Sequence, residues 1–172
     1  MQNLFSYPLY VEDMGSGAKL YKLEATTKQL AYITEVLKVD GVKSFKAEIE
    51  VKFSRKIHRI DVRGKVEAEV EQTSVVSLEK FSKIYNPEFS IFFDTELNLK
   101  QMREIEYEFD DEVPDLVENG QIDLAAIAME QLALALDDFP RKDGEVFKFE
   151  SEFDEETTQK TNPFAALSAL KK

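Results

Sequence analysis

The sequence contains no cysteine and no tryptophan, and it has a single histidine. The absence of cysteine excludes disulfide bonds and thiolate metal sites, and it suits a reducing compartment. No segment approaches the about 18 uninterrupted apolar residues that a membrane-spanning helix needs. The N-terminus lacks the charged start and apolar run of a signal peptide. We therefore expect a soluble, cytoplasmic protein that does not bind a membrane.

Motifs for catalysis and for cofactor binding are also missing. Gly15 and Gly17 match neither the P-loop nor the dinucleotide-binding spacing, and the chain has no other glycine-rich phosphate loop. His58 has no nearby nucleophile pattern from which a catalytic triad is built. The acids show no calcium-loop spacing. The sequence thus predicts a protein that is not an enzyme, with no cofactor, no metal and no identifiable small-molecule substrate.

Charge is abundant and unevenly distributed. The net charge is −12. Residues 1–65 hold 12 Lys/Arg and 8 Asp/Glu, whereas residues 66–172 hold 10 Lys/Arg and 26 Asp/Glu. Such asymmetry bears on solubility and on partners, not on the fold. The acid-rich region after residue 65 leaves a choice of interpretations open, either a solvated surface or a surface for a basic partner.

Alternating apolar and polar residues predict β-strands most clearly at residues 45–53 and 60–70. Because the two runs lie close together in the sequence, they predict an antiparallel hairpin with one apolar and one charged face. Residues 94–103 are polar and predict a loose segment. Weaker patterns predict further extended segments near residues 4–11, 19–25, 72–81, 89–93 and 105–109.

Two main helices are expected. Thr26 and Gln29 form a plausible capping box at the start of a helix over residues 26–38. Residues 123–136 predict a second helix that is apolar on nearly all sides, so we expect it to be central and largely buried. Glu130 in this helix lies among apolar neighbours and is expected to be buried, either paired with an arginine or serving as a functional acid.

These elements predict an α+β fold. We expect a bent antiparallel sheet of about five to seven strands packed with the two main helices. Residues 1–141 form the predicted domain, and the polar, acidic residues 142–161 a flexible linker. Residues 162–172 predict a short C-terminal helix on this tether, because Asn162 suits the N-cap and Pro163 the first helical position.

The connection between the two clearest strands is the predicted nucleic-acid site. Cations on a protruding connection are well placed to meet phosphates, although no aromatic stacking motif accompanies them. The alternative is a charged strand face with cross-strand ion pairs, because Lys and Glu alternate along it. The candidate residues are Arg55, Lys56, His58, Arg59 and Arg63.

A second candidate surface is acidic and would bind a protein. Residues 104–118 hold eight acids and no base. In the C-terminal helix an apolar stripe is expected to dock on this domain or on a partner. The candidate residues for a protein partner are Glu104, Glu106, Glu108, Asp110, Asp111, Glu112, Phe164 and Leu167.

An ordered set of segments resembles the YceD-like family of bacteria and plastids, which is required for accumulation of large-subunit ribosomal RNA. The resemblance implies a non-enzymatic role in ribosome biogenesis. We therefore expect a partner that is ribosomal RNA or a pre-ribosomal particle. The alternative, favoured by the overall negative charge, is that the acidic surface holds a basic ribosomal protein. The segments are Val62-Arg-Gly64, Val66-Glu-Ala68, Gln72 to Phe81, Asn119 to Leu124, Glu130 to Leu136, Phe139-Pro140-Arg141 and Asn162 to Leu167.

The chain departs from this family at one motif. Many relatives have a Cys-x-x-Cys pair where this sequence has Ser74 and Ser77, and a proline where it has Lys80. Serine is not a competent zinc ligand. Any metal-stabilised subsite of those relatives is therefore expected to be absent here.

Overall fold

The computed structural model describes residues 4–104 and 113–146. The chain divides into two units, residues 1–142 and 143–172, and the fold presented below is that of the first. The predicted linker lies mostly outside the described residues and the predicted C-terminal helix lies entirely outside them. Both therefore stay predictions.

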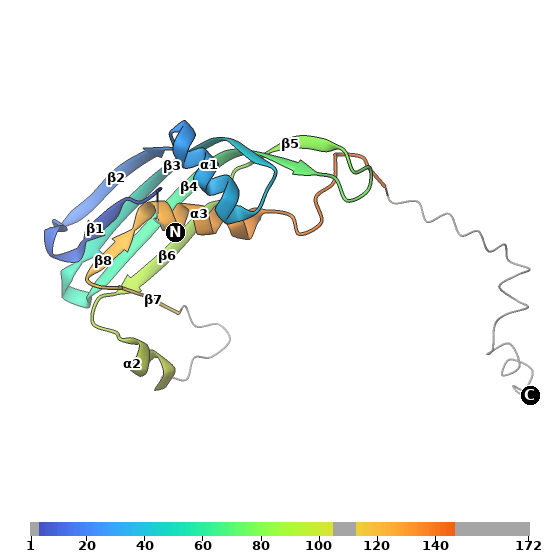
Figure 1. Cartoon of the computed structure of the whole chain (residues 1–172). Helices are drawn as coiled ribbons and strands as arrows, with labels where there is room; N and C mark the ends of the chain where they lie inside the picture. Colours follow the sequence, from blue (N-terminus) through green and yellow to red (C-terminus); the bar gives the residue numbers. More distant parts are fainter. Residues whose placement is uncertain (1–3, 105–112, 147–172) are drawn as a thin grey trace, which may run out of the picture. The chain divides into compact units, whose positions relative to one another are not determined.

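A six-stranded sheet is the main element of the first unit (Figure 1). Its strands follow the order β2-β3-β4-β6-β7, and β5 lies beside β4. β4 is long enough for two partners, so residues 59–65 pair with β6 and residues 68–73 pair with β5. All pairs are antiparallel except the two-residue pair of β6 with β7. The bounds are β2 Gly17–Glu24, β3 Gly41–Ser54, β4 Arg59–Thr73, β5 Lys80–Tyr85, β6 Glu88–Asp94 and β7 Asp115–Leu116.

The β3–β4 hairpin confirms the clearest prediction from the sequence. Phe45 lies opposite Ala68, and Val51 lies opposite Val62, so the apolar residues of both strands share one face. An irregularity between Val42 and Ser44 shifts the register once, which keeps Val42 buried on the same face. The other face carries the charged residues, as period-two alternation requires.

Helices α1 (Thr27–Leu37) and α3 (Leu124–Ala135) cover the apolar face (Figure 1). α1 connects β2 to β3, starts at the predicted capping box and ends where Lys38 takes a left-handed conformation. Ile33 and Leu132 are fully buried in the common core. The predicted fold class, a bent sheet packed with two main helices, is therefore confirmed.

Two smaller features were not expected. β1 (Pro8–Tyr10) pairs with β8 (Gln121–Asp123) in a separate two-stranded sheet. The stretch predicted to be loose instead contains α2 (Leu99–Glu104). Asn98 caps this helix, since its Oδ1 accepts from the amides of Lys100 and Gln101, each at 3.0 Å. Short 3-10 turns span Val11–Asp13 and Arg55–Ile57.

The expectation that Glu130 is buried was wrong. Its side chain is exposed, and Leu134 on the same helix is 74% exposed. α3 packs with one side on the sheet, and its apolar residues continue around onto the open side. The apolar composition of this helix therefore led us to expect more burial than the structure shows.

Candidate nucleic-acid interface

The charged face of the sheet is largely neutralised by cross-strand pairs in its middle. The Nζ atoms of Lys22 and Lys65 lie 2.8 and 3.2 Å from the carboxylate of Glu48. The register explains this, because Glu48 stands between these two lysines on the neighbouring strands. Hydrogen bonds from both ammonium groups lower the pKa of Glu48 below its ordinary value. Glu88 stands opposite Lys65 on β6, so two acids match the two lysines of this row.

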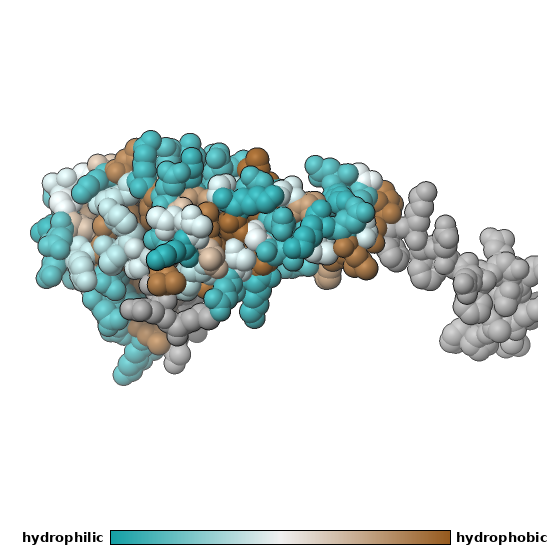
Figure 2. Space-filling model, turned by 45° about the horizontal axis from the view of Figure 1, so that its top comes forward, coloured by the Kyte–Doolittle hydropathy of each residue, from teal (hydrophilic) through white to brown (hydrophobic). Residues whose placement is uncertain are grey.

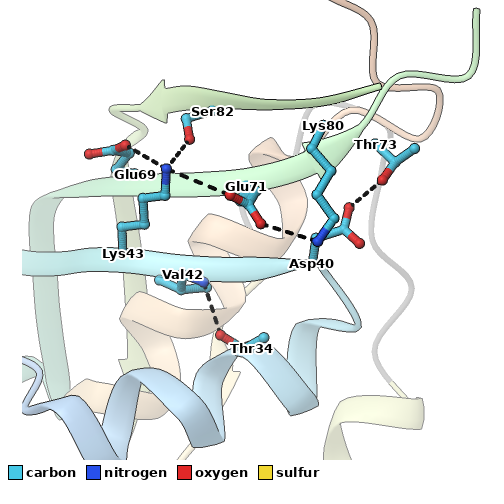
Figure 3. A network of polar contacts seen from close by, with 9 residues as sticks. All are labelled: Thr34, Asp40, Val42, Lys43, Glu69, Glu71, Thr73, Lys80 and Ser82. Atoms are coloured by element: carbon cyan, nitrogen blue, oxygen red, sulfur yellow. Dashed lines mark hydrogen bonds and ion pairs between the residues drawn. The ribbon is translucent and has the colours of Figure 1, made fainter. Parts of the chain in front are cut away.

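A second paired region lies where β3, β4 and β5 run side by side (Figure 3). Lys43 Nζ donates to Ser82 Oγ at 2.7 Å, and it lies 3.6 Å from Glu69 and 3.7 Å from Glu71. Lys80 lies 3.4 Å from Glu71 on the same face. These lysines are also matched by acids, so the sheet face has no broad positive patch in this region.

In the hairpin connection, residues 54–59, the cationic side chains do not form lysine–glutamate pairs across neighbouring strands of the described chain. Arg55 Nη2 donates to the backbone oxygen of Met14 at 2.9 Å, and its guanidinium lies over the Phe53 ring. His58 adopts a left-handed backbone conformation with φ 52°, and its Nδ1 lies 3.2 Å from Glu96 Oε1, a pair that is ionic only when the imidazole is protonated. The exposed Lys56 side chain forms no ion pair or hydrogen bond within the described part of the chain.

Arg59 and Arg63 extend this group along β4 on the charged face. Arg59 Nε donates to Asp61 Oδ1 at 2.7 Å, and the Arg59 guanidinium lies 3.8 Å from the centre of the Phe92 ring. Arg63 is exposed and, among residues 4–104 and 113–146, has no ion-pair partner. The five predicted residues thus all lie at one end of the hairpin, but only Lys56 and Arg63 present cationic side chains without a partner there.

Phe92 was missed in the sequence. The alternation of Phe89, Ile91 and Phe93 indicates a strand with these three side chains on the buried face. Phe92 lies between Ile91 and Phe93, at a position that should face solvent. An aromatic residue at such a position was the signal that could have identified it. In the structure Phe92 lies opposite Asp61, which places its ring beneath Arg59.

Of the acidic candidate residues for a protein partner, only Glu104 is described, and it is exposed at the end of α2. Asp115 and Glu118 of the same acid-rich segment are also exposed. Nothing within the described part of the chain tests its proposed role. The remaining candidates for a protein partner fall outside the described residues: Glu106, Glu108, Asp110, Asp111, Glu112, Phe164 and Leu167.

The turn between β4 and β5 carries the two serines that replace the cysteine pair. Ser74 is completely buried, and its Oγ accepts from the amides of Val76 at 3.1 Å and Ser77 at 3.3 Å. The amide of Leu78 donates to the Ser74 carbonyl at 2.9 Å, with Leu78 itself at φ 60°. A serine hydroxyl therefore closes this turn through hydrogen bonds to the backbone.

The described residues lack the features of two other kinds of site. They contain no group of three or more His, Asp or Glu side chains arranged to hold a metal ion. Among them, no helix has the length and apolar composition that crossing a bilayer requires.

Comparison with protein families gives one match. The model of the family described as "Large ribosomal RNA subunit accumulation protein YceD" matches residues 62–171. The chain belongs to the YceD family. This confirms the resemblance seen in the sequence, and it gives the chain a role in accumulation of large-subunit ribosomal RNA, as the family name states. No curated protein and no solved structure gives a significant match.

The YceD match covers only part of the candidate interface. It begins at Val62 on β4 and therefore includes Arg63 and Phe92. Arg55, Lys56, His58 and Arg59 lie before it. The family is named for the accumulation of an RNA and not for a chemical reaction.

Proposed function

We infer that this YceD-family chain supports accumulation of large-subunit ribosomal RNA by binding that RNA, or an assembling particle that contains it, without catalysis. The binding surface is the hairpin end of the charged sheet face, formed by Arg55, Lys56, His58, Arg59 and Arg63. One observation carries the proposal: at this end the exposed cations Lys56 and Arg63 form no ion pair within the described residues, although Glu50 stands opposite Arg63 in the register.

The chemistry of this surface suits a nucleic-acid backbone. Unpaired cations gain affinity by displacing the counterions condensed on phosphates. The Arg59–Phe92 stack adds a flat cationic surface on which an unpaired base can lie. The net charge of −12 repels RNA at long range, so contact needs a local group of exposed cations such as the one at this end of the hairpin.

The double variant Lys56→Ala/Arg63→Ala tests this proposal. With large-subunit ribosomal RNA transcribed in vitro as the probe, we expect the salt dependence of log K to decrease by about 1.4, the value for two lost phosphate contacts to single-stranded RNA. Affinity near physiological salt falls roughly tenfold. Filter binding over a series of salt concentrations measures both quantities.

The matched control is Lys22→Ala/Lys65→Ala, which removes two lysines from the same sheet face. Both of these pair with Glu48, so we expect a much smaller change in salt dependence. Equal effects of the two double variants would show that RNA responds only to net charge, and the proposed surface would be wrong. No RNA binding by the unaltered chain would be equally decisive.

A second candidate function is that the acid-rich residues 104–118 hold a basic ribosomal protein before it assembles. The net charge of −12, with 26 acids after residue 65, favours this function over RNA contact at long range. It predicts that the chain purified from cells carries a basic ribosomal protein. Recovery of RNA without any ribosomal protein would contradict it.

A further inference from the structure

We propose that a groove at the C-terminal ends of α1 and α3 binds a basic amphipathic segment of a partner protein. None of the residues that line this groove belongs to the proposed RNA-binding surface or to the acid-rich segment 104–118. The proposal does not depend on the function inferred above.

The groove has a volume of about 580 Å³ and lies between the two helices and the end of β4. Its apolar wall comes from the last turn of α1, the segment after it, and the end of α3. Some of this wall is open to solvent, since Val36 is 40% exposed, and Ala133 is also exposed. The apolar residues that line it are Val36, Leu37, Val39, Ala133, Leu136 and Pro140.

Exposed apolar surface continues beyond the groove. Leu134 and Phe139 are each 74% exposed on either side of Leu136. Val75 donates its amide to the carbonyl of Pro140 at 2.9 Å, which brings the tip of the β4–β5 hairpin beside this chain segment. Figure 2 shows apolar surface at the end of the first unit where this hairpin lies. A partner with apolar side chains therefore has more surface to cover than the groove alone.

The charged atoms of the groove favour a cationic partner. Asp40, Asp137 and Asp138 line it, against a single cation, Lys38. Asp138 forms no ion pair within the described residues. The ion pair with Lys83, at 2.6 Å, lowers the pKa of Asp137 below its ordinary value and already matches the charge of that carboxylate. The acids of the groove without an ion pair among the described residues are therefore Asp40 and Asp138. The C-terminal ends of both helices add partial negative charge in the same place.

Gln72 presents a hydrogen-bond donor to the groove. This residue lines the groove and is only 6% exposed. Its Oε1 accepts a hydrogen bond from the Tyr85 hydroxyl at 2.5 Å. Its amide nitrogen has no acceptor among the described residues. No buried side-chain nitrogen or oxygen of the described residues lacks a partner, so this nitrogen is accessible from the groove. A backbone carbonyl of a bound segment would accept from it.

An arginine or lysine flanked by leucines fits these features together. The aliphatic stem of such a cation packs along apolar walls while its charge reaches a carboxylate. Asp138 and the helix C-termini accept the cation, the walls and Phe139 cover the apolar neighbours, and Gln72 anchors the backbone. An acidic or purely apolar segment would leave some of these groups unmatched.

The experiment uses the full chain and a short fluorescein-labelled peptide of Arg, Lys and Leu. We expect Asp138→Lys to weaken binding about tenfold, the effect of reversing one charge at an interface, whereas Glu12→Lys makes the same charge change on a different segment of the chain and leaves binding nearly unchanged. We expect Ala133→Trp, which fills the groove without altering charge, to abolish binding. Ala31→Trp, on an exposed side of α1 outside the groove, is its control.

Two further measurements sharpen the result. Peptide binding is expected to shift the NMR resonance of the Gln72 side-chain amide in the unaltered chain. A peptide with serine in place of leucine, at unchanged charge, is expected to bind much more weakly. The proposal is overturned if Glu12→Lys weakens binding as much as Asp138→Lys, or if Ala133→Trp behaves like Ala31→Trp. It is equally overturned if an uncharged leucine peptide binds as tightly.

Discussion

Replacing Gly64 by alanine is expected to reduce the free energy of unfolding by about 1–3 kcal/mol, the cost of overpacking a well-filled core. Gly64 lies in the middle of β4, between Ile49 of β3 and Phe89 of β6. A Cβ atom built there lies 2.8 Å from the backbone oxygen of Glu48 and 2.8 Å from Cζ of Phe89. The Glu48 oxygen cannot move freely because β3 is held in the ladder, and the Phe89 ring is packed against the core. Urea unfolding followed by circular dichroism measures the difference.

Gly41→Ala is the matched control for this prediction. Gly41 also lies in the sheet, at the start of β3, but a Cβ there meets its nearest neighbour, Cβ of Glu71, at 3.6 Å. That is an ordinary contact, so we expect little loss of stability. If Gly64→Ala is as stable as Gly41→Ala, the packing described between β3, β4 and β6 is incorrect.

The Asp123→Ala variant is expected to lose about 2–4 kcal/mol of stability, because one carboxylate serves both a helix cap and a tertiary link. Its Oδ1 accepts from the amides of Ala125 at 3.0 Å and Ala126 at 3.2 Å at the start of α3. The same carboxylate accepts from the Tyr7 amide at 2.8 Å and the Ser6 hydroxyl at 2.6 Å. Removing it frees four donors at once.

Asp123→Asn separates the geometric role of this residue from its charge. Asparagine is also a good N-cap, and its oxygen occupies the place of the carboxylate oxygen, so we expect most of the stability to remain. Hydrogen exchange would reveal the tertiary link, with the amides of β1 and β8 exchanging faster in Asp123→Ala. Unchanged exchange in these strands would contradict the proposed coupling of the N-terminal segment to α3.

The sequence predicts those elements of the fold that short-range patterns determine. The β3–β4 hairpin follows from period-two alternation over two neighbouring runs. The starts of α1 and α3 follow from Thr26 with Gln29 and from Asp123, whose side chains act within one helical turn. α2 has a comparable local signal in Asn98 with Gln101, and the polar composition around it concealed the cap.

Long-range pairing lies beyond such patterns. Nothing near Pro8–Tyr10 indicates that its partner is Gln121–Asp123, and nothing in β4 reveals that two different strands divide its second edge. The pattern of a strand shows which of its faces is apolar, but it does not show which other strand pairs with it. The parallel contact of β6 with the two residues of β7 is equally invisible.

The sequence predicts which residues form the candidate site, but it does not predict which of their charges are paired. Arg55, Lys56, His58, Arg59 and Arg63 are adjacent along one hairpin, so their grouping follows from local sequence. Their pairing does not, since Met14 and Glu96 are distant in the chain from the residues they contact. Phe92 reaches the site only because β6 pairs with β4.

Crosslinking in cells, followed by identification of both RNA and protein attached to the chain, tests the RNA contact most directly. We expect large-subunit ribosomal RNA to be attached to peptides that contain Arg59 to Arg63. We also expect this attachment to be lost in Lys56→Ala/Arg63→Ala and kept in Lys22→Ala/Lys65→Ala. Crosslinks to protein alone, with no ribosomal RNA on the β3–β4 hairpin, would contradict the proposed RNA-binding surface.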